Sequence, residues 1–391
     1  MTLVMACSSE SPDTIPQHIA ELENVSIHQT DPESAPVWNL KPEVSFGDTD
    51  DVLIAGHIRN FAVDDQGRVY IADTGTQGIH IYAPDGSFLT TIGREGRGPG
   101  EFQTIMAIRV RNNRIHVLDR QQKIVVFEWQ GDEVRLVQEY DLTLQDLDEQ
   151  PGWMKRAQEK GWYPRPASFN LDPDGRYLIH FVDSSVPMNA VLEGRTSNIA
   201  RYDPARRTYT DLDIISFDWT GRVLVHEVEG GMSVFFDIPY KRDSRFDYRD
   251  GEWVHGWSEE FLLRIYDNEG NYLRASYYDL PQKPLDAQTM IRLYENAGDW
   301  FQSIIREDDH PETWPAFQDV FWDDEGRIWV SRIDADPEVT VWMVLDADGE
   351  LIGRAELPTS SRVRYIGREA VYAIELDEEE LIHVMRYRLE R

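Results

Sequence analysis

The sequence Asp64-Asp65-Gln66-Gly67-Arg68-Val69-Tyr70-Ile71-Ala72 decides the fold of this chain, because it is the first copy of a pattern that recurs. Gly67 supplies the positive φ of a tight turn, and the β-branched and aromatic residues after it are typical of a strand. The segment therefore predicts the first hairpin of a β-sheet.

Five more copies of this turn and strand follow, at 111–117, 172–179, 249–255, 323–330 and 368–373. A second hairpin comes after several of them, as at 79–89, 263–273 and 341–351. Two successive hairpins make one four-stranded blade of a β-propeller. The closest turns are 43 and 46 residues apart, which matches a blade of about 40–50 residues. We predict an all-β fold, a six-bladed β-propeller over residues 37–391.

The wider separations between turns predict three insertions, near 141–163, 215–237 and 281–313. Apolar residues recur with helical spacing in the third, at 290, 293, 294, 297, 301, 304 and 305. We therefore expect short helical insertions, including one amphipathic helix over 281–313 that lies on the propeller.

The two ends of the chain predict how the ring closes. Residues 381–387 have the pattern of a third strand, and the chain stops shortly after them. Residues 37–46 are the candidate for the missing fourth strand. Pairing these two segments would join the first and last blades and remove two exposed sheet edges.

The charge of the chain excludes one class of partner. It contains 71 acidic and 39 basic residues, for a formal net charge of −32. Affinity for nucleic acid comes mainly from Lys and Arg, so we predict no nucleic-acid partner. Anionic headgroups are disfavoured as a docking surface for the same reason. The acidic residues are typical of a solvated, soluble surface.

Cys7 is the single cysteine, so the chain can form no intrachain disulfide and no cysteine-based zinc site. The segment Leu3-Val4-Met5-Ala6-Cys7 resembles the lipobox of bacterial lipoproteins, in which the cysteine carries the lipid. The basic and apolar region of a secretory signal is missing upstream. We expect a truncated lipoprotein signal and a flexible tether over residues 1–36, lipid attachment at Cys7, contact with a membrane only through that anchor, and a location in the bacterial cell envelope.

The first two blades resemble NHL-type six-bladed propellers, including bacterial lipoproteins described only by that fold. The resemblance lies in 61–73 and in Gly93-Arg94-Glu95-Gly96-Arg97-Gly98-Pro99-Gly100-Glu101-Phe102, which is similar to the connector between NHL blades. It implies the fold far more than an activity, because propellers have unrelated functions. The glycines of 93–102 could also suggest a phosphate loop, but strands flank them and no Lys follows, so we favour the connector.

Related propellers suggest two metals, zinc and calcium. Amidating-lyase-like NHL enzymes hold zinc through histidines of several inner strands, and the chain offers the candidates His57, His116, His180, His226 and His255. Their positions do not repeat that pattern, so we predict no metal site of this kind. Lactonase-like propellers hold calcium with oxygen ligands, so calcium stays open, although we interpret Asp346–Glu350 as a hairpin turn. No other cofactor is predicted.

The candidate ligand-binding residues lie at the predicted mouth of the channel, where the inner strands begin. They are Arg59, Asn60, Arg94, Arg97, Glu101, Arg165, Gln318 and Asp319. Arginine forks there could hold a carboxylate or a sugar acid. Aromatic residues in or beside the insertions could stack on a sugar, namely Trp153, Trp162, Tyr163, Trp300 and Trp314. The alternative for each residue is structural, with the arginines paired to nearby acids and the aromatic rings packed on the ring of blades.

The favoured function is that of a non-enzymatic binding or interaction scaffold. Its ligand would be a small molecule, a carbohydrate, a peptide or an envelope protein, held at the channel mouth under a lid formed by the insertions. The alternative is a metal-assisted lyase or hydrolase that acts on a sugar acid or lactone at the same mouth. The catalytic residues of such an enzyme are unknown from the sequence.

Overall fold

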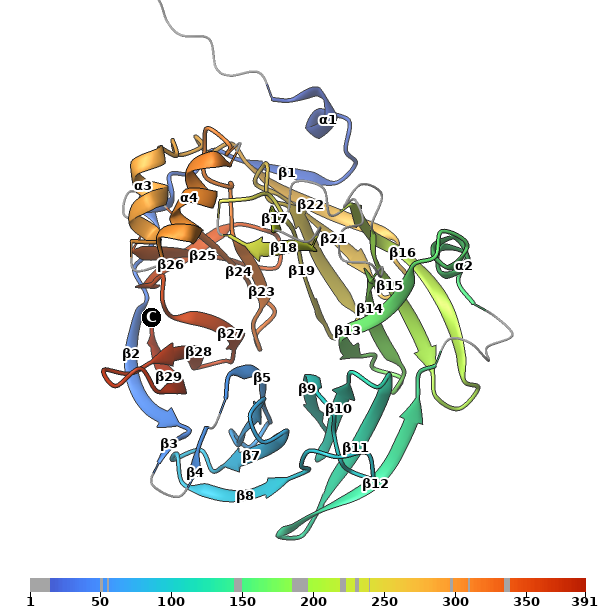
Figure 1. Cartoon of the computed structure of the whole chain (residues 1–391). Coiled ribbons are helices and arrows are strands. Elements are labelled where there is room, and N and C mark those ends of the chain that lie inside the picture. Colours follow the sequence, from blue (N-terminus) through green and yellow to red (C-terminus); the bar gives the residue numbers. More distant parts are fainter. Residues whose placement is uncertain are drawn as a thin grey trace, which may run out of the picture.

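The computed structural model describes residues 15–49, 52–54, 56–143, 150–184, 196–218, 223–228, 232–238, 240–295, 298–308, 310–333 and 338–391. Six β-sheets stand around a common axis (Figure 1). Each predicted turn joins the first two strands of one sheet. The six-bladed all-β propeller expected from the repeated turn is therefore confirmed.

The first three blades each contain four consecutive antiparallel strands. Blade one consists of β5 (Ile58–Val63), β6 (Val69–Asp73), β7 (Gly78–Tyr82) and β8 (Phe88–Ile92). Blade two consists of β9 (Ile105–Arg111), β10 (Arg114–Asp119), β11 (Lys123–Gln130) and β12 (Glu133–Asp141). Blade three consists of β13 (Tyr163–Leu171), β14 (Tyr177–Ser184), β15 (Thr196–Asp203) and β16 (Thr208–Asp218).

Blades four and five repeat this order, and blade six takes its last strand from the start of the chain. Blade four consists of β19 (Ser244–Arg249), β20 (Glu252–Trp257), β21 (Leu262–Asp267) and β22 (Tyr272–Tyr278). Blade five consists of β23 (Asp319–Trp322), β24 (Ile328–Ile333), β25 (Val339–Leu345) and β26 (Leu351–Pro358). Blade six consists of β27 (Arg362–Ile366), β28 (Ala370–Leu376), β29 (Ile382–Glu390) and β2 (Asn39–Phe46). We call β5, β9, β13, β19, β23 and β27 the inner strands.

A buried aspartate organises the first turn in several blades. In blade one, the Asp64 carboxylate accepts hydrogen bonds from the Gln66 and Arg68 amides, the Arg68 guanidinium and the Tyr70 hydroxyl. Asp323 repeats this arrangement in blade five, as described below. Because a buried carboxylate is costly unless fully hydrogen-bonded, the turn and its aspartate stabilise each other.

The hydrophobic core lies between neighbouring blades rather than at one centre. Tyr70 and Ile81 of blade one, for example, pack with Ile108 and Ile115 of blade two. Because each sheet is apolar on both faces, each blade needs both neighbours to bury its side chains.

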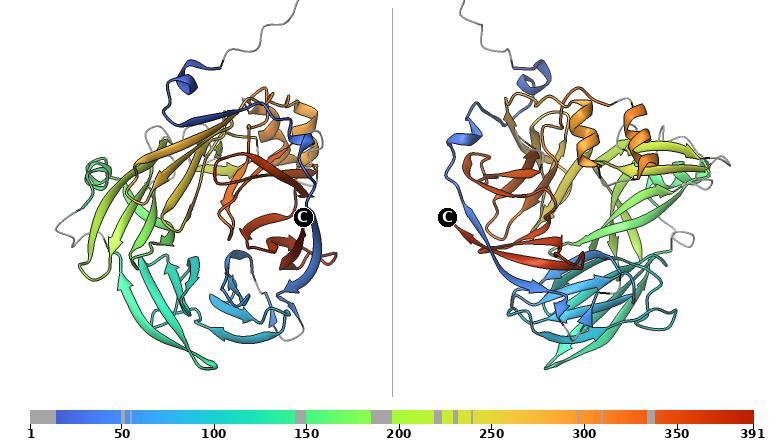
Figure 2. Two further views of the ribbon diagram at one scale, coloured as in Figure 1. Left: turned by 180° about the vertical axis from the view of Figure 1, so that it is seen from behind. Right: turned by 60° about the vertical axis from the view of Figure 1, so that its left-hand side comes forward.

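Residues 15–46, which we call the N-terminal belt, run along the outside of three blades (Figures 1 and 2). The belt begins with α1 (Gln17–Ala20), β1 (Val25–His28) and η1 (Pro32–Ser34). β1 pairs in parallel with β22 of blade four, the Trp38 amide donates to the Arg354 carbonyl of blade five, and β2 pairs with β29 of blade six.

The closure predicted for residues 37–46 is therefore confirmed. Of the signal and flexible tether expected over residues 1–36, the flexible tether is wrong for residues 15–36, because the apolar side chains of Ile19 and Val25 pack on blade four and β1 extends its sheet. Residues 1–14, including Cys7, lie outside the described part of the chain. The short hairpin of β3 (Asp48–Thr49) and β4 (Val52–Leu53) follows the belt.

The insertions form small separate elements. The first contains α2 (Gly152–Glu159), and the second the hairpin of β17 (Val223–Val228) and β18 (Met232–Asp237). The single helix predicted over 281–313 is wrong, because the segment forms two helices, α3 (Ala287–Leu293) and α4 (Asp299–Glu307).

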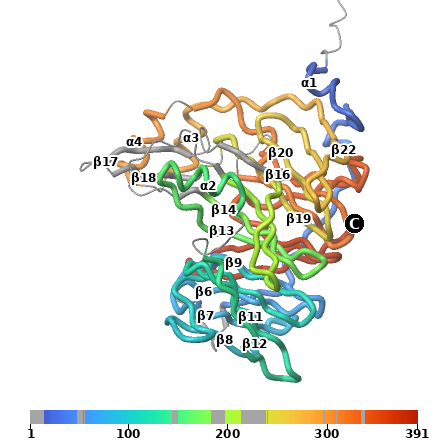
Figure 3. Tube along the Cα trace, turned by 90° about the vertical axis from the view of Figure 1, so that its right-hand side faces the viewer, coloured from blue at the N-terminus to red at the C-terminus, as the bar shows by residue number. Residues whose placement is uncertain are grey.

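Gly298 is the N-cap residue of α4, and because glycine is unfavourable inside a helix, one helix running through this position is disfavoured. The described ones among the predicted apolar positions still share one cluster, in which Met290 of α3 and Ile304 and Ile305 of α4 are buried against Tyr240. Position 297 lies outside the described residues. Helices α2, α3 and α4 gather on one face of the ring (Figure 3). Among the described residues, no helix has the length and hydropathy that crossing a membrane requires.

Candidate functional site

A cavity of about 740 Å³ lies on the axis of the propeller, and all six inner strands contribute to its wall. The wall also includes the turns at which the inner strands end, such as Asp65, Asn112 and Asp250, whose side chains are exposed. The cavity therefore opens at the face that carries these turns.

The insertions connect blades at the opposite end of the inner strands, and none of their described residues lines the cavity. The described parts of the insertions thus do not form the expected lid over this cavity. The reason is topological: each insertion leads from the outer strand of one blade to the beginning of the next inner strand, whereas the cavity lies at the strands' other end.

Strand register places six residues at one level of the cavity wall. Each of the six pairs with the third residue after the equivalent turn position of its own blade, as Ala62 pairs with Tyr70, three residues after Gly67. The six positions are therefore equivalent around the axis. In blade order they are Ala62, Arg109, Asn170, Asp247, Phe321 and Tyr365. Blades two, three and four thus contribute a cation, an amide and an anion, and blades five, six and one contribute apolar and aromatic side chains.

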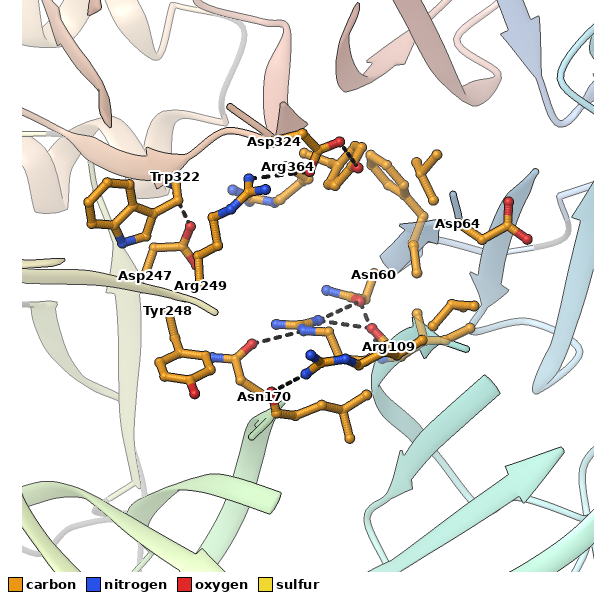
Figure 4. Close-up of a pocket in the computed structure, with 18 of the residues that line it drawn as sticks. Asn60, Asp64, Arg109, Asn170, Asp247, Tyr248, Arg249, Trp322, Asp324 and Arg364 are labelled. Carbon is orange, nitrogen blue, oxygen red and sulfur yellow. Dashed lines mark hydrogen bonds and ion pairs between the residues drawn. The ribbon is translucent and has the colours of Figure 1, made fainter. Parts of the chain in front are cut away.

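Arg109 joins three blades through neutral acceptors (Figure 4). Its Nε donates to Asn170 Oδ1 at 3.0 Å, and its Nη1 donates to the Ile108 carbonyl at 2.9 Å and approaches Asn60 Oδ1 at 3.5 Å. Burial lowers the pKa of Arg109, and the charge of Asp247 opposes that shift. In the described part of the chain, Arg109 has no ion pair with a carboxylate, and its Nη2 has no hydrogen-bond partner.

Asp247 lies on the same level, two blades away. Its Oδ2 accepts a hydrogen bond from the Trp322 amide of blade five at 2.8 Å. Burial raises the pKa of Asp247 to about 6, although the Trp322 and Tyr248 amides and the charges of Arg109 and Arg249 favour ionisation. Within the described residues, Asp247 has no cation within the 4.0 Å of an ion pair, so Arg109 and Arg249 act on its charge only from a longer distance.

The remaining charges of the wall divide into paired and unpaired groups. Arg249 bridges Asp250 and Asp324, each at 3.3 Å, and Asp324 also accepts from the Tyr365 hydroxyl at 2.6 Å. Arg111 donates to the Leu171 carbonyl at 3.2 Å, and Arg364 lies 3.4 Å from the Val363 carbonyl. Neither guanidinium forms an ion pair with a carboxylate among the described residues. Three of the four arginines in the wall can therefore accept an anionic ligand group.

Of the eight candidate ligand-binding residues, only Asn60 lines this cavity. Arg59 and Arg165 are exposed near the beginning of their strands. The Asp319 carboxylate lies 4.0 Å from the Arg245 guanidinium, and the backbone amide of Gln318 donates to the Ser331 carbonyl at 2.7 Å.

The other three candidates belong to the glycine-rich connector between blades one and two. Arg94 forms an ion pair with Glu101 at 2.6 Å, and Glu101 also accepts from the Gly98 amide at 2.8 Å. Arg97 is exposed, with its Nε 2.7 Å from the side-chain amide of Gln103. A Cβ atom on Gly96 would be 2.1 Å from the Glu101 carboxylate, which explains why residue 96 is a glycine. The segment follows β8 and leads into β9, so it is a connector between strands rather than a phosphate loop.

The candidate histidines are dispersed. His116 Nδ1 lies 2.9 Å from the Tyr177 hydroxyl, and His255 Nε2 lies 2.7 Å from Ser244 Oγ. Burial lowers the pKa of both imidazoles to about 4, so they are neutral at pH 7. The side chain of His226 lies outside the described residues. Within the described ranges, no three His, Cys, Asp or Glu side chains are grouped to hold a metal ion.

The aromatic candidates have two kinds of environment. Trp153 and Trp314 are buried in hydrophobic clusters, and Lys160 lies 4.6 Å from the ring of the partly buried Trp162. Tyr163 and Trp300 are 57% and 53% exposed. None of the five lines the axial cavity.

The sequence contained a signal for the residues that were missed. Arg109 and Asp247 are charged residues that follow an apolar or aromatic residue in their inner strands, two positions before each strand ends. A charge in such a position is unusual unless it faces a cavity or a partner. This signal was present in blades two and four but became visible only when the six inner strands were aligned.

Residues 47–180 match the model of a family described as "6-bladed beta-propeller". The chain is a six-bladed β-propeller. Its structure is similar to that of a DUF4221-family protein from Bacteroides vulgatus, with a TM-score of 0.52 and 12% identity over 92% of this chain and 100% of that chain. A candidate exported protein from Bacteroides fragilis matches with a TM-score of 0.48 and 13% identity, over 94% and 99% of the two chains. No match was found among curated proteins. At these identities the similarity shows the fold alone.

Proposed function

We propose that this chain is a binding protein of the bacterial cell envelope, whose axial cavity holds a small ligand through a carboxylate group. One observation carries the proposal: Arg109, Arg111 and Arg364 line the same cavity without a carboxylate partner in the described part of the chain.

The chemistry of the cavity supports a small anionic ligand. A guanidinium fork binds a carboxylate with two parallel hydrogen bonds, and such bonds are stronger where water is largely excluded. The volume of about 740 Å³ is within the range of small-molecule sites. A sugar acid, an amino acid and a short peptide all present the required carboxylate.

The envelope location rests on the sequence around Cys7, which resembles a lipobox, and on the resemblance to NHL-type lipoproteins. Metabolic labelling with a palmitate analogue tests it in the bacterium that carries the gene. We expect the native protein to be labelled and the Cys7→Ser variant to be unlabelled and released from the membrane fraction. Equal labelling of the two proteins would reject Cys7 as the anchor.

Calorimetric titration tests the binding function. The purified chain is titrated with a panel of carboxylates that includes glucuronate, L-leucine and leucyl-leucine. We expect at least one to bind, and the Arg111→Gln variant to bind it about 10-fold or more weakly, as for loss of a charged hydrogen bond. Arg135→Gln is the matched control, because Arg135 is exposed and pairs with Glu133 on an outer strand.

The titration also separates binding from catalysis. We expect mass spectrometry to recover the bound compound unchanged. A converted product would show that the chain is an enzyme. Equal affinities of the Arg111→Gln variant and the native chain would show that Arg111 does not hold the ligand.

A further inference from the structure

The cavity has two different sides at the level of the six equivalent residues, which are Ala62, Arg109, Asn170, Asp247, Phe321 and Tyr365. The polar half lies on three successive blades, with Asn170 between a cation and an anion. The apolar half lies on the other three blades. A ligand group at this level therefore meets two opposite charges on one side and aromatic surface on the other, whereas Arg111, Asp324 and Arg364 line the cavity at neighbouring positions.

Neither Arg109 nor Asp247 forms an ion pair among the described residues, although the charge of each acts on the pKa of the other. Arg109 uses two of its nitrogen atoms on neutral oxygens and leaves Nη2 for a further acceptor. Asp247 uses Oδ2 on a backbone amide and forms no ion pair among the described residues. Since a desolvated charge is costly without an opposite charge, both groups favour a ligand that supplies one.

A simple carboxylate would compensate Arg109 but would bring a second negative charge toward Asp247. A sugar acid could donate hydroxyl groups to Asp247, but hydroxyl groups would leave its charge unneutralised. A zwitterion satisfies both residues, with its carboxylate at Arg109 and its ammonium at Asp247. Its apolar part would then lie toward Phe321 and Tyr365.

We infer that the ligand is zwitterionic, an α-amino acid or short peptide with a free amino group, a free carboxylate and an apolar side chain. This inference rests on the proposed function and specifies the ligand of the same cavity. Asp247 is its specificity-determining residue, because it distinguishes an ammonium group from a neutral substituent.

Four probes test the inference by calorimetric titration: L-leucine, leucyl-leucine, the N-acetyl derivative of whichever binds, and glucuronate. The N-acetyl derivative keeps the carboxylate and the side chain and loses only the positive charge. We expect the free amino compound to bind at least 10-fold more tightly than its N-acetyl derivative. In the Asp247→Asn variant that ratio should fall to about 1, because the amide cannot form an ion pair with the ammonium.

Asp348→Asn is the matched control, since Asp348 lies at an exposed hairpin turn outside the cavity wall and the substitution removes the same charge. It should keep the full preference for the free amine. Circular dichroism and the melting temperature verify that each variant is folded, and the preference of the native chain needs no variant at all.

The outcomes separate this inference from the proposed function. Tight binding of glucuronate without binding of either amino compound would overturn the zwitterion and leave the carboxylate site standing. Equal affinity for the free and N-acetylated compounds would also overturn it. No binding of any probe would reject both proposals.

Discussion

The indole of Trp38 lies directly against the backbone of Gly353, where a Cβ atom would be only 2.4 Å from the ring. Trp38 belongs to the N-terminal belt, and Gly353 lies in the outer strand of blade five. Arg327 and Arg391 lie 5.0 and 5.2 Å from the same indole, so the belt, blade five and the C-terminus meet at one side chain.

This contact predicts that Gly353→Ala destabilises the propeller. The added methyl group must displace the Trp38 ring, and overpacking of this kind costs about 1–3 kcal/mol in the free energy of unfolding. Urea denaturation followed by tryptophan fluorescence measures the change. Gly298→Ala is the control, because no atom lies within 4 Å of the added Cβ there. Similar stability of the two variants would mean that the belt is not closely packed at Trp38.

Asp247 predicts a pH dependence of stability. Burial raises its pKa to about 6 from the usual 3.8, so the folded chain holds this proton more tightly than the unfolded chain. The stability it contributes is therefore fully present below pH 3.8 and is lost as the pH rises through about 6. Arg109 and Arg249, the cations that face it, reduce this loss.

Asp247→Asn keeps a neutral side chain at every pH. We expect the variant to match the native chain near pH 3.8 and to exceed its stability at pH 7.5 by at most about 3 kcal/mol. Parallel denaturation curves at both pH values measure the difference in the free energy of unfolding. The contributions of the other carboxylates cancel because both proteins contain them. A difference that does not change with pH would show that Asp247 has an ordinary pKa.

The buried Asp323 predicts a large effect of a small change. Its Oδ1 accepts from the Glu325 and Arg327 amides, and its Oδ2 accepts from the Arg327 guanidinium and the Trp329 indole N–H. In Asp323→Asn, an NH₂ group would face those last two donors. We expect a loss of about 3 kcal/mol, as for breaking a buried ion pair, measured by urea denaturation. Asp348→Asn, at an exposed hairpin turn, should change stability little.

Ile19 predicts that the beginning of the belt can detach locally. It is fully buried against Leu262, Ala275 and Tyr277 of blade four. Ile19→Ala should remove about 2–4 kcal/mol from the docking of residues 15–28. We expect faster hydrogen exchange there, with little change in the global melting temperature, because β2 still closes the ring.

Ile27→Ala is the matched control for this experiment. Ile27 lies in β1 but is 37% exposed, so its truncation should leave hydrogen exchange nearly unchanged. If Ile19→Ala lowers the global melting temperature as much as it speeds local exchange, the belt and the ring unfold together.

Most of the fold could be predicted from the sequence because its signals are local. The turns around Gly67, Gly175 and Gly326 each require a positive φ within a few residues of an apolar strand. The insertion at 281–313 shows the limit of such reasoning, since helical periodicity predicted its buried positions but not the break before Gly298. The docking of β1 was missed because it depends on the edge of β22, which is distant in the sequence.

The sequence by itself determined the six blades, the closure by residues 37–46 and the acidic composition, because turn chemistry, strand periodicity and charge belong to short segments. Only the tertiary structure decided which part of the axis remains open. That depends on how side chains from six inner strands fill the space together. Arg109 and Asp247 share one level because two separate strands end in the same register, a relation that neither strand's sequence contains.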